Sequence, residues 1–295
     1  VTGTSSGLGN ALVHELLDSG YCVIATARQI DSLQEELSRK YDAEILKRAV
    51  VTKLDVTKPE QVEAAFAAGL EKFGRVDVVV NNAGYVAEIE AFPMEDARLQ
   101  FEIMFWGPVH ICKEAVRIFR KVNSPGGGQI FNISSTGGYS SQPTLSYYNS
   151  AKFALEGFTE SLRKEMDPEW NIQATIVEPG GFNTNWRDGN MRVLPPHPDY
   201  TADTSPAKQY RTMLAGLPFI GDPEKAAKAF LDLAEEKQDL PLRVQFGSDA
   251  LAVIRHTAMK TISDSEKWES ISHSTSNLDG IDPKEYTMNL LAALG

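Results

Sequence analysis

The sequence contains few cysteines and histidines and has no excess of positive charge. Its two cysteines, Cys22 and Cys112, fall in segments with strand and helix patterns, so we expect buried thiols rather than a disulfide. Unpaired thiols are typical of a reducing compartment, and we therefore expect a cytoplasmic protein. The five histidines are scattered without the spacing of metal ligands, which disfavours a metal site.

Two further absences narrow the class of protein. No run of about 18 apolar residues occurs in the chain, so we expect no membrane-spanning helix. Lysine and arginine number 29 against 40 aspartate and glutamate residues, and this net charge of −11 disfavours nucleic acid as a partner. A local basic pocket for a single phosphate remains compatible with this balance.

Short apolar segments alternate with helical patterns over the first two thirds of the chain. Hydrophobic residues make up 42% and charged residues 23%, the composition of a globular protein with a sizeable core. The alternation predicts an α/β fold, in which helices cover both faces of a parallel sheet. We expect strands at 21–27, 49–56, 76–84, 128–135 and 172–180, and helices near 8–19, 59–73, 96–122 and 146–166.

We expect one domain over residues 1–295. Residues 1–184 carry the strand–helix alternation and would form the core, whereas the proline-rich residues 185–220 are predicted to form an irregular flap over the substrate. Residues 221–295 are predicted to contain C-terminal helices and a weakly specified tail. The sequence opens at Val1 directly on a glycine-rich turn, so we expect a first strand upstream of this numbering.

The glycine-rich turn TGTSSGLG, residues 2–9, precedes the first predicted helix. Its glycines would let the backbone approach a pyrophosphate, and the helix N-terminus offers free N–H groups and a positive dipole end. The spacing Gly-x3-Gly-x-Gly differs from the Gly-x-Gly-x2-Gly dinucleotide fingerprint, so the turn alone is a weak indicator. We expect a dinucleotide cofactor to contact Gly3, Ser5, Ser6, Gly7, Leu8 and Gly9.

The end of the next predicted strand indicates which dinucleotide binds. An acidic residue at this position, about 20 residues beyond the turn, would hold the 2′-hydroxyl of the adenosine ribose. Here Ala27 is followed by Arg28, and a guanidinium can bind a 2′-phosphate through paired charge-assisted hydrogen bonds. We therefore expect NADP(H) in preference to NAD(H), with Ser5 and Ser6 as further donors. The alternative is that Arg28 is only a solvated charge.

Residues 147–152, YYNSAK, contain two tyrosines and a lysine. Tyr148 and Lys152 are four residues apart and share a helix face, whereas Tyr147 does not share it. A phenol with a pKa of about 10 is a poor acid or base at neutral pH, but a nearby ammonium favours the phenolate and lowers its pKa. The spacing alone does not distinguish a catalytic phenol from an ordinary amphipathic helix.

Six motifs occur in order along the first 184 residues: TGTSSGLG (2–9), LDV (54–56), NNAG (81–84), NISS (132–135), YNSAK (148–152) and EPGGFNT (178–184). Together they strongly resemble the short-chain dehydrogenase/reductase family in its single-domain form. ATAR at 25–28 and SAKFALEG at 150–157 make the 17β-hydroxysteroid-dehydrogenase-like branch the most similar. The resemblance implies a Rossmann-type doubly wound parallel sheet and an oxidoreductase.

The resemblance also implies roles for matching positions. Tyr148 would exchange a proton with the substrate, Ser135 would hydrogen-bond the substrate oxygen, and Lys152 would tune Tyr148 and bind the nicotinamide ribose. Ser134 would point to the other side of the strand. The remaining implied cofactor contacts are Asp55 and Val56 at the adenine, Asn82, Ala83 and Gly84 beside the ribose, and Pro179, Gly180, Phe182 and Thr184 at the nicotinamide.

One position departs from the family pattern. The family places an asparagine in the helix before the serine strand, where it holds a water that links the lysine to solvent; the matching stretch here, FEIMFWG at 101–107, has Met104. A thioether is only a weak hydrogen-bond acceptor. Either water or a backbone carbonyl completes the proton relay and reductase activity is retained, or the redox chemistry is altered or lost.

We expect an NADPH-dependent carbonyl reductase, reversible as an alcohol dehydrogenase, that acts on a medium-sized hydrophobic ketone or alcohol. Apolar and aromatic flap residues, among them Trp186 and Tyr210, favour such a substrate. The alternatives are a family descendant that binds NADP(H) but catalyses a non-redox cyclisation or isomerisation, and a nucleotide-sensing protein. By resemblance, the helices near 96–122 and 146–166 would build a homodimer or homotetramer.

Overall fold

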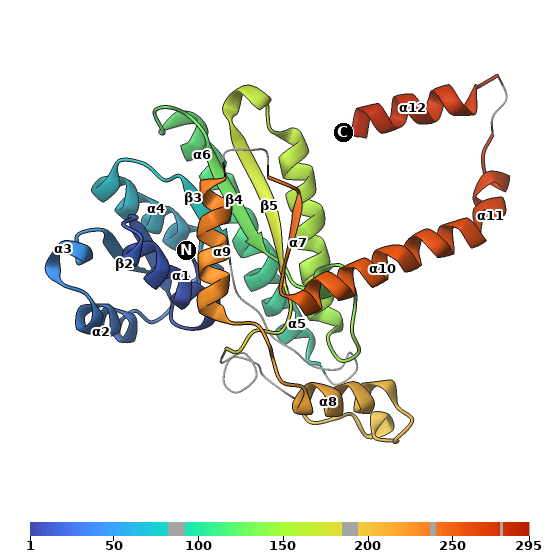
Figure 1. Cartoon of the computed structure of the whole chain (residues 1–295), viewed down its shortest axis with the longest axis horizontal. Helices are drawn as coiled ribbons and strands as arrows, with labels where there is room; N and C mark the ends of the chain where they lie inside the picture. The colour runs from blue at the N-terminus through green and yellow to red at the C-terminus, as the bar shows by residue number, and fades with distance from the viewer. Residues whose placement is uncertain (82–91, 185–193, 237–239, 278–279, 295) are drawn as a thin grey trace.

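The computed structural model describes residues 1–81, 92–184, 194–236, 240–277 and 280–294. These residues form a parallel sheet with helices on both faces, as the strand–helix alternation predicts (Figure 1). The Rossmann-type α/β fold expected from the sequence is therefore confirmed.

The strands form two parallel groups that meet at the start of the chain. Val1 and Thr2 lie between the groups, because Thr26 N–H donates to Val1 O (3.1 Å) and Thr2 N–H donates to Val80 O (2.9 Å). The strand order reverses at this point, and ligands of open α/β sheets bind at such a switch point, beyond the carboxyl ends of the strands. One group pairs β1 (Val23–Ala27) with β2 (Ala49–Lys53), and the other has the order β3 (Val78–Asn81), β4 (Gly128–Ile133), β5 (Ile172–Pro179) and β6 (Arg243–Phe246).

Two helical layers cover the sheet. Neighbouring strand residues point to opposite faces, so that Val79 of β3 packs with α4 and α6 while Val80 packs with α1 and α9. The ends of α4 follow from its sequence, since Pro59 occupies the first turn and Gly74 closes the helix in the left-handed region (φ 77°). The layers are built from α4 (Pro59–Phe73), α6 (Gly107–Lys121) and α7 (Ser146–Glu165) on one face, and from α1 (Gly7–Asp18) and α9 (Pro223–Glu235) on the other.

Shorter elements complete the core. A five-residue π-helix, η1 (Glu102–Trp106), joins α5 (Met94–Phe101) to α6. One short 3-10 helix follows β4, a second follows α7, and a third precedes α8. The remaining bounds are α2 (Asp31–Lys40), α3 (Ala43–Leu46), η2 (Thr136–Gly138), η3 (Pro168–Trp170), η5 (Pro198–Tyr200) and α8 (Pro206–Gly216).

The last helices extend away from the sheet (Figure 1). The first turn of α10 (Ser248–Lys267) packs beside β6 and η2, but the side chains beyond Thr261 in this helix are exposed. Helices α11 (Glu269–Ser274) and α12 (Pro283–Leu294) follow, where a weakly specified tail was expected. In the described part of the chain, no helix is both long enough and apolar enough to cross a membrane.

The structure corrects three expectations from the sequence. Cys22 is exposed rather than buried, because the strand begins one residue later, at Val23; Cys112 is buried as expected. The sequence analysis also missed α2, whose pattern is mostly polar, and β6, which is only four residues long.

Candidate active site

The glycine turn lies at the switch point of the sheet. Gly3 and Gly7 have positive φ angles (67° and 62°), a conformation that favours glycine. Thr4 fixes the turn to the end of β1, because its N–H and its hydroxyl both donate to Thr26 O, each at 3.1 Å. A Cβ on Gly9 would lie 2.5 Å from the Gly3 carbonyl oxygen, so the turn and the first turn of α1 approach too closely for any side chain there.

The N-terminus of α1 suits an anion. Its first turn contains no acidic residue, and the side chain of the N-cap residue Ser6 makes no capping hydrogen bond. The helix therefore presents its N–H groups and positive dipole end without a carboxylate in its first turn. Ser5 is exposed, and Leu8 is half-buried. Thr184 approaches the turn from the other side of the site, since its methyl carbon would lie 3.4 Å from a Cβ on Gly7.

Arg28 and Asp55 lie near each other at the ends of β1 and β2. Arg28 is exposed, immediately after β1. Burial acts to raise the pKa of Asp55, but hydrogen bonds from the Thr57 hydroxyl (2.8 Å) and N–H (3.0 Å), together with the charge of Arg28, lower it overall. Val56 packs so closely against Gly107 of α6 that a Cβ there would lie 2.7 Å from the valine methyl.

Ser135 and Tyr148 come together although they lie on different elements. Ser135 follows β4, and its hydroxyl oxygen accepts the Gly137 N–H at 3.1 Å. Burial raises the pKa of the Tyr148 phenol, a hydrogen bond with Ser135 partly opposes this, and the half-buried Tyr210 of α8 adds to the increase. The lower tyrosine pKa expected from the sequence is thus wrong for the protein chain alone, because burial outweighs the stabilisation of the phenolate.

Lys152 lies one helical turn after Tyr148, as the spacing predicts. Its Nζ is 5.9 Å from the centroid of the Tyr148 ring and donates to Ile133 O at 2.7 Å. The side chain is 4% exposed, and burial lowers the pKa of its ammonium to about 8, an effect that the negative charge of Glu156 opposes. The Tyr147 hydroxyl contacts Met94 Sδ of α5 instead (3.7 Å), so Tyr147 does not share this site.

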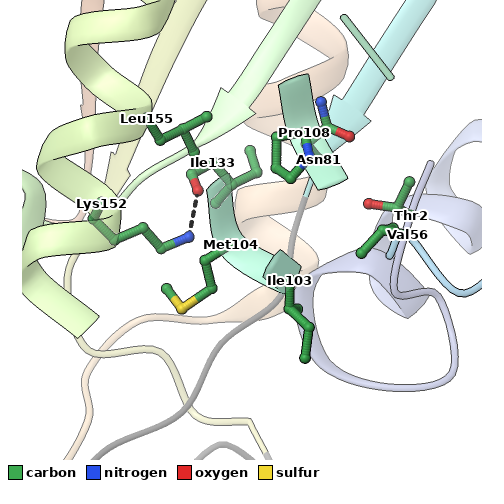
Figure 2. A pocket seen from close by; sticks show the side chains of 9 residues that line it. All are labelled: Thr2, Val56, Asn81, Ile103, Met104, Pro108, Ile133, Lys152 and Leu155. Atoms are coloured by element: carbon green, nitrogen blue, oxygen red, sulfur yellow. Dashed lines mark hydrogen bonds between the residues drawn. The ribbon is translucent and has the colours of Figure 1, made fainter. Parts of the chain in front are cut away.

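Met104 lies in η1, in the position where the family pattern has asparagine. Figure 2 shows its side chain beside the Lys152 ammonium, and Met104 is 1% exposed. Single-turn π-helices are frequent at functional sites. A cavity of about 10 Å³ lies here, at the lower limit of the space that one water molecule requires. It is lined by Thr2, Val56, Asn81, Ile103, Met104, Pro108, Ile133, Lys152 and Leu155.

The segment after β5 is held by β6 and α10. Pro179 ends β5, and the N–H of Gly180 donates to the carbonyl oxygen of Phe246, the last residue of β6, at 2.9 Å. Gly181 N–H donates to Asp249 Oδ2 of α10 at 2.7 Å, and Phe182 is buried. The sequence analysis missed Asp249, whose position in the first turn of a helix was its only signal.

Two comparisons identify the chain. Residues 1–192 match the family model described as short chain dehydrogenase. The chain belongs to the short-chain dehydrogenase/reductase family. It is 40% identical over 285 residues to an uncharacterised oxidoreductase, C162.03, of Schizosaccharomyces pombe, an alignment that covers 96% of this chain and 92% of the relative. The solved short-chain dehydrogenase of Streptomyces avermitilis superposes with a TM-score of 0.82 at 33% identity, covering 94% of this chain and 97% of the other.

A further relative agrees with this assignment. The oxidoreductase calM of Penicillium decumbens is 36% identical over 283 residues, which cover 92% of this chain and 90% of the relative. The family resemblance seen in the motifs is therefore confirmed, whereas the 17β-hydroxysteroid-dehydrogenase-like branch stays a prediction. Asn82, Ala83 and Gly84, and flap residues 185–193, lie outside the described residues.

A buried polar ladder supports the site of this short-chain dehydrogenase. Asn81 Nδ2 donates to Asn132 Oδ1 (2.9 Å), and Asn132 Nδ2 donates to Thr159 Oγ1 (2.8 Å). The ladder joins β3, β4 and α7 directly below the carboxyl ends of the strands. Hydrogen-bonded groups in a low-dielectric interior fix a unique arrangement, so these side chains hold the strand that precedes Ser135 against the helix that carries Tyr148.

Proposed function

We propose that this short-chain dehydrogenase/reductase is an NADPH-dependent carbonyl reductase, reversible as an alcohol dehydrogenase. The observation that supports it best is the convergence of Ser135, Tyr148 and Lys152, with the Ser135–Tyr148 hydrogen bond and the Lys152 ammonium 5.9 Å from the tyrosine ring. A serine donor, a phenol and an ammonium are the groups that carbonyl reduction needs beside a hydride donor.

The residues present fit a nicotinamide dinucleotide. The open N-terminus of α1 and the positive-φ glycines form a cradle for a pyrophosphate. An ammonium has three donors, and the hydrogen bond to Ile133 O uses one, which leaves Lys152 able to bind ribose hydroxyls. When bound, the nicotinamide supplies the hydride.

The protein side chains would handle the substrate oxygen and its proton. Because Ser135 Oγ accepts the Gly137 N–H, its hydroxyl hydrogen, which stabilises the Tyr148 oxygen in the chain alone, could donate to a substrate carbonyl oxygen placed between the two side chains. Tyr148 would give its proton to the developing alkoxide, and the positive charge of Lys152 would stabilise the phenolate that remains. Burial raises the pKa of Tyr148 overall, so the phenol carries its proton at neutral pH, and this is the form that donates in carbonyl reduction.

Arg28 supports NADP(H) over NAD(H). It is exposed at the end of β1, and its positive charge helps to lower the pKa of Asp55, which lies just beyond the end of the neighbouring strand β2. A guanidinium in this place can bind a 2′-phosphate, whereas a carboxylate would repel it.

The substrate would be a medium-sized hydrophobic ketone or alcohol. Tyr210 of α8, which falls within the proposed flap, lies close enough to raise the pKa of Tyr148, and an aromatic side chain near the phenol would favour an apolar substrate. The relatives named above are oxidoreductases and a dehydrogenase, and these names give no support to a non-redox cyclisation or isomerisation.

Replacement of Tyr148 by phenylalanine tests the reaction. Tyr148→Phe removes the proton donor, and we expect NADPH oxidation with a carbonyl panel to fall by at least about 100-fold, with NADPH binding by fluorescence titration retained. Tyr147→Phe removes the neighbouring hydroxyl outside the site and serves as the matched control, with activity within about twofold of the wild type. Undiminished turnover in Tyr148→Phe would contradict the mechanism.

Four wider properties belong to the same proposal. We propose that residues 1–184 form the cofactor-binding and catalytic core, residues 185–220 the substrate flap and residues 221–295 the C-terminal helices. We also propose a cytoplasmic location and a homodimer or homotetramer, with a small hydrophobic carbonyl or alcohol compound as the bound partner.

A further inference from the structure

A buried group of charges lies directly behind Lys152 and Ser135. Glu156 is 3% exposed, and its Oε1 accepts the Ser134 hydroxyl at 2.6 Å. Its Oε2 lies 3.1 Å from Nε of Arg243 on β6. Gly138 packs over this contact so closely that a Cβ would overlap both the serine oxygen and the carboxylate. The carboxylate is therefore held on three sides.

Lys152 and Glu156 form hydrogen bonds with two consecutive residues, Ile133 and Ser134. The lysine and the glutamate are one turn apart on α7. Lys152 donates to Ile133 O (2.7 Å), and Glu156 accepts the Ser134 hydroxyl (2.6 Å). Ser135, the proposed donor to the substrate oxygen, is the next residue. The position of Ser135 relative to Tyr148 therefore depends on both contacts, since α7 carries Tyr148 as well.

Glu156 also supplies a negative charge that acts on the buried Lys152 ammonium. Burial lowers the pKa of Lys152, and the charge of Glu156 opposes that effect. The other described groups that act on Glu156 are Ser134 after β4, Glu178 on β5 and Arg243 on β6. Arg243 also contacts Glu160 of α7 and Glu178, and Gln245 of β6 donates to Glu178.

The charge state of the group follows mainly from burial, and the charge of a second buried carboxyl adds to the effect on Glu156. Glu178 is fully buried, lies 3.8 Å from Arg243 and accepts a hydrogen bond from Gln245 at 2.6 Å. Burial raises the pKa of Glu156 to about 7 and also raises the pKa of Glu178. Glu156 is thus ionised in the alkaline range, where Lys152 begins to lose its proton.

We propose that Glu156 is a positioning residue of the reductase site, which holds the Ser134–Ser135 segment against α7 and stabilises the buried Lys152 ammonium by its negative charge. This inference rests on the proposed function for its effect on turnover, but its electrostatic part concerns Lys152 alone. It also gives Ser134 a role, although the sequence analysis set this residue aside as the neighbour that points away.

The electrostatic part is tested by titrating Lys152 directly. In the full chain with 13C-labelled lysine, the Lys152 signal is assigned by its loss in Lys152→Arg and followed by NMR. We expect a midpoint near pH 8 in the wild type and a midpoint about one pH unit lower in Glu156→Gln. Glu160→Gln also removes a carboxylate partner of Arg243 but does not contact Ser134, so it serves as the matched control with an unchanged midpoint.

Two more variants separate the effect of the Glu156 charge from the effect of its contact with Ser134. Glu156→Asp keeps the charge and should return the Lys152 midpoint to the wild-type value, which also decides the matter if Glu156→Gln does not fold. Ser134→Ala removes the hydroxyl contact and leaves the Glu156 carboxyl group in place, so we expect an unchanged KM for NADPH and a kcat about tenfold lower.

Each result has a clear meaning. An unchanged Lys152 midpoint in Glu156→Gln, or an equal shift in Glu160→Gln, overturns the electrostatic role, and wild-type kcat in Ser134→Ala overturns the positioning role. If the wild type reduces no carbonyl at all, the proposed function fails, while the lysine titration still decides whether Glu156 stabilises Lys152.

Discussion

Arg28 is the residue on which the proposed preference for NADP(H) depends. Arg28→Ala removes a hydrogen-bond donor to the 2′-phosphate, and Ala27→Asp adds a carboxylate that can accept a hydrogen bond from the ribose 2′-hydroxyl. We expect Arg28→Ala with Ala27→Asp to raise the KM for NADPH by about 10- to 100-fold, since a charge-assisted hydrogen bond is worth about 1.5–3 kcal/mol. The KM for NADH should stay the same or fall.

Initial-rate kinetics with both nucleotides measure this preference. Gln29→Ala alters the next exposed side chain and should leave the NADPH-to-NADH ratio unchanged. A wild type that already prefers NADH would show that Arg28 is only a solvated charge.

At the scale of single residues, the sequence was informative where partners are close along the chain. Tyr148 and Lys152 share a helix face because of a four-residue spacing, which is readable without a structure. Glu156 lies on the same face one turn further on, but its partners Ser134 and Arg243 are 22 and 87 residues away. No local pattern indicates such contacts, so the role of Glu156 could only come from the fold.

At the scale of elements, the turn and the helix that follows it act as a unit. A methyl group at Gly9 would lie 2.5 Å from the Gly3 oxygen, and this overlap has no flexible side chain to relieve it. We expect Gly9→Ala to destabilise the fold by about 1–3 kcal/mol and to weaken NADPH binding, measured by urea unfolding and fluorescence titration.

Gly157 provides the matched control for this substitution. It lies in the interior of α7 with no atom within 4 Å of an added Cβ, and alanine has the higher helix propensity. Gly157→Ala should therefore stabilise the fold by about 0.5–1 kcal/mol. Equal stability changes in the two variants would contradict the close packing of the turn.

The elements that the sequence did not predict have a common physical cause. Strand β6 consists of Arg243–Phe246, and its first three residues are only half-buried, so it lacks the continuous apolar run that identified the inner strands. Helix α2 is mostly polar and buries only Leu33 and Leu37. Both elements are stabilised by tertiary contacts with the sheet rather than by a strong local pattern.

At the scale of the whole molecule, exposed apolar side chains are consistent with self-association. Leu99, Trp106 and Phe153 on α5, η1 and α7 are 48%, 46% and 44% exposed, on the helices for which the family resemblance implies an interface. We expect light scattering to give two or four times the chain mass of 32.5 kDa. A mass of one chain at micromolar concentration would contradict the proposed oligomer.

The buried carboxyl and ammonium also determine how folding exchanges protons with water. The pKa of Glu156 is about 7 in the folded chain against 4.5 for an ordinary carboxyl, so between these pH values folding takes up protons. The stability from this group is complete below pH 4.5 and is lost as the pH rises through 7. Lys152 has the opposite behaviour, because its pKa falls from 10.5 to about 8 and folding releases a proton in that range. Near neutral pH the folded chain therefore keeps the Lys152 ammonium, and the ionised fraction of Glu156, at a cost in stability, and mild acid should strengthen the fold at Glu156 while it leaves Lys152 charged.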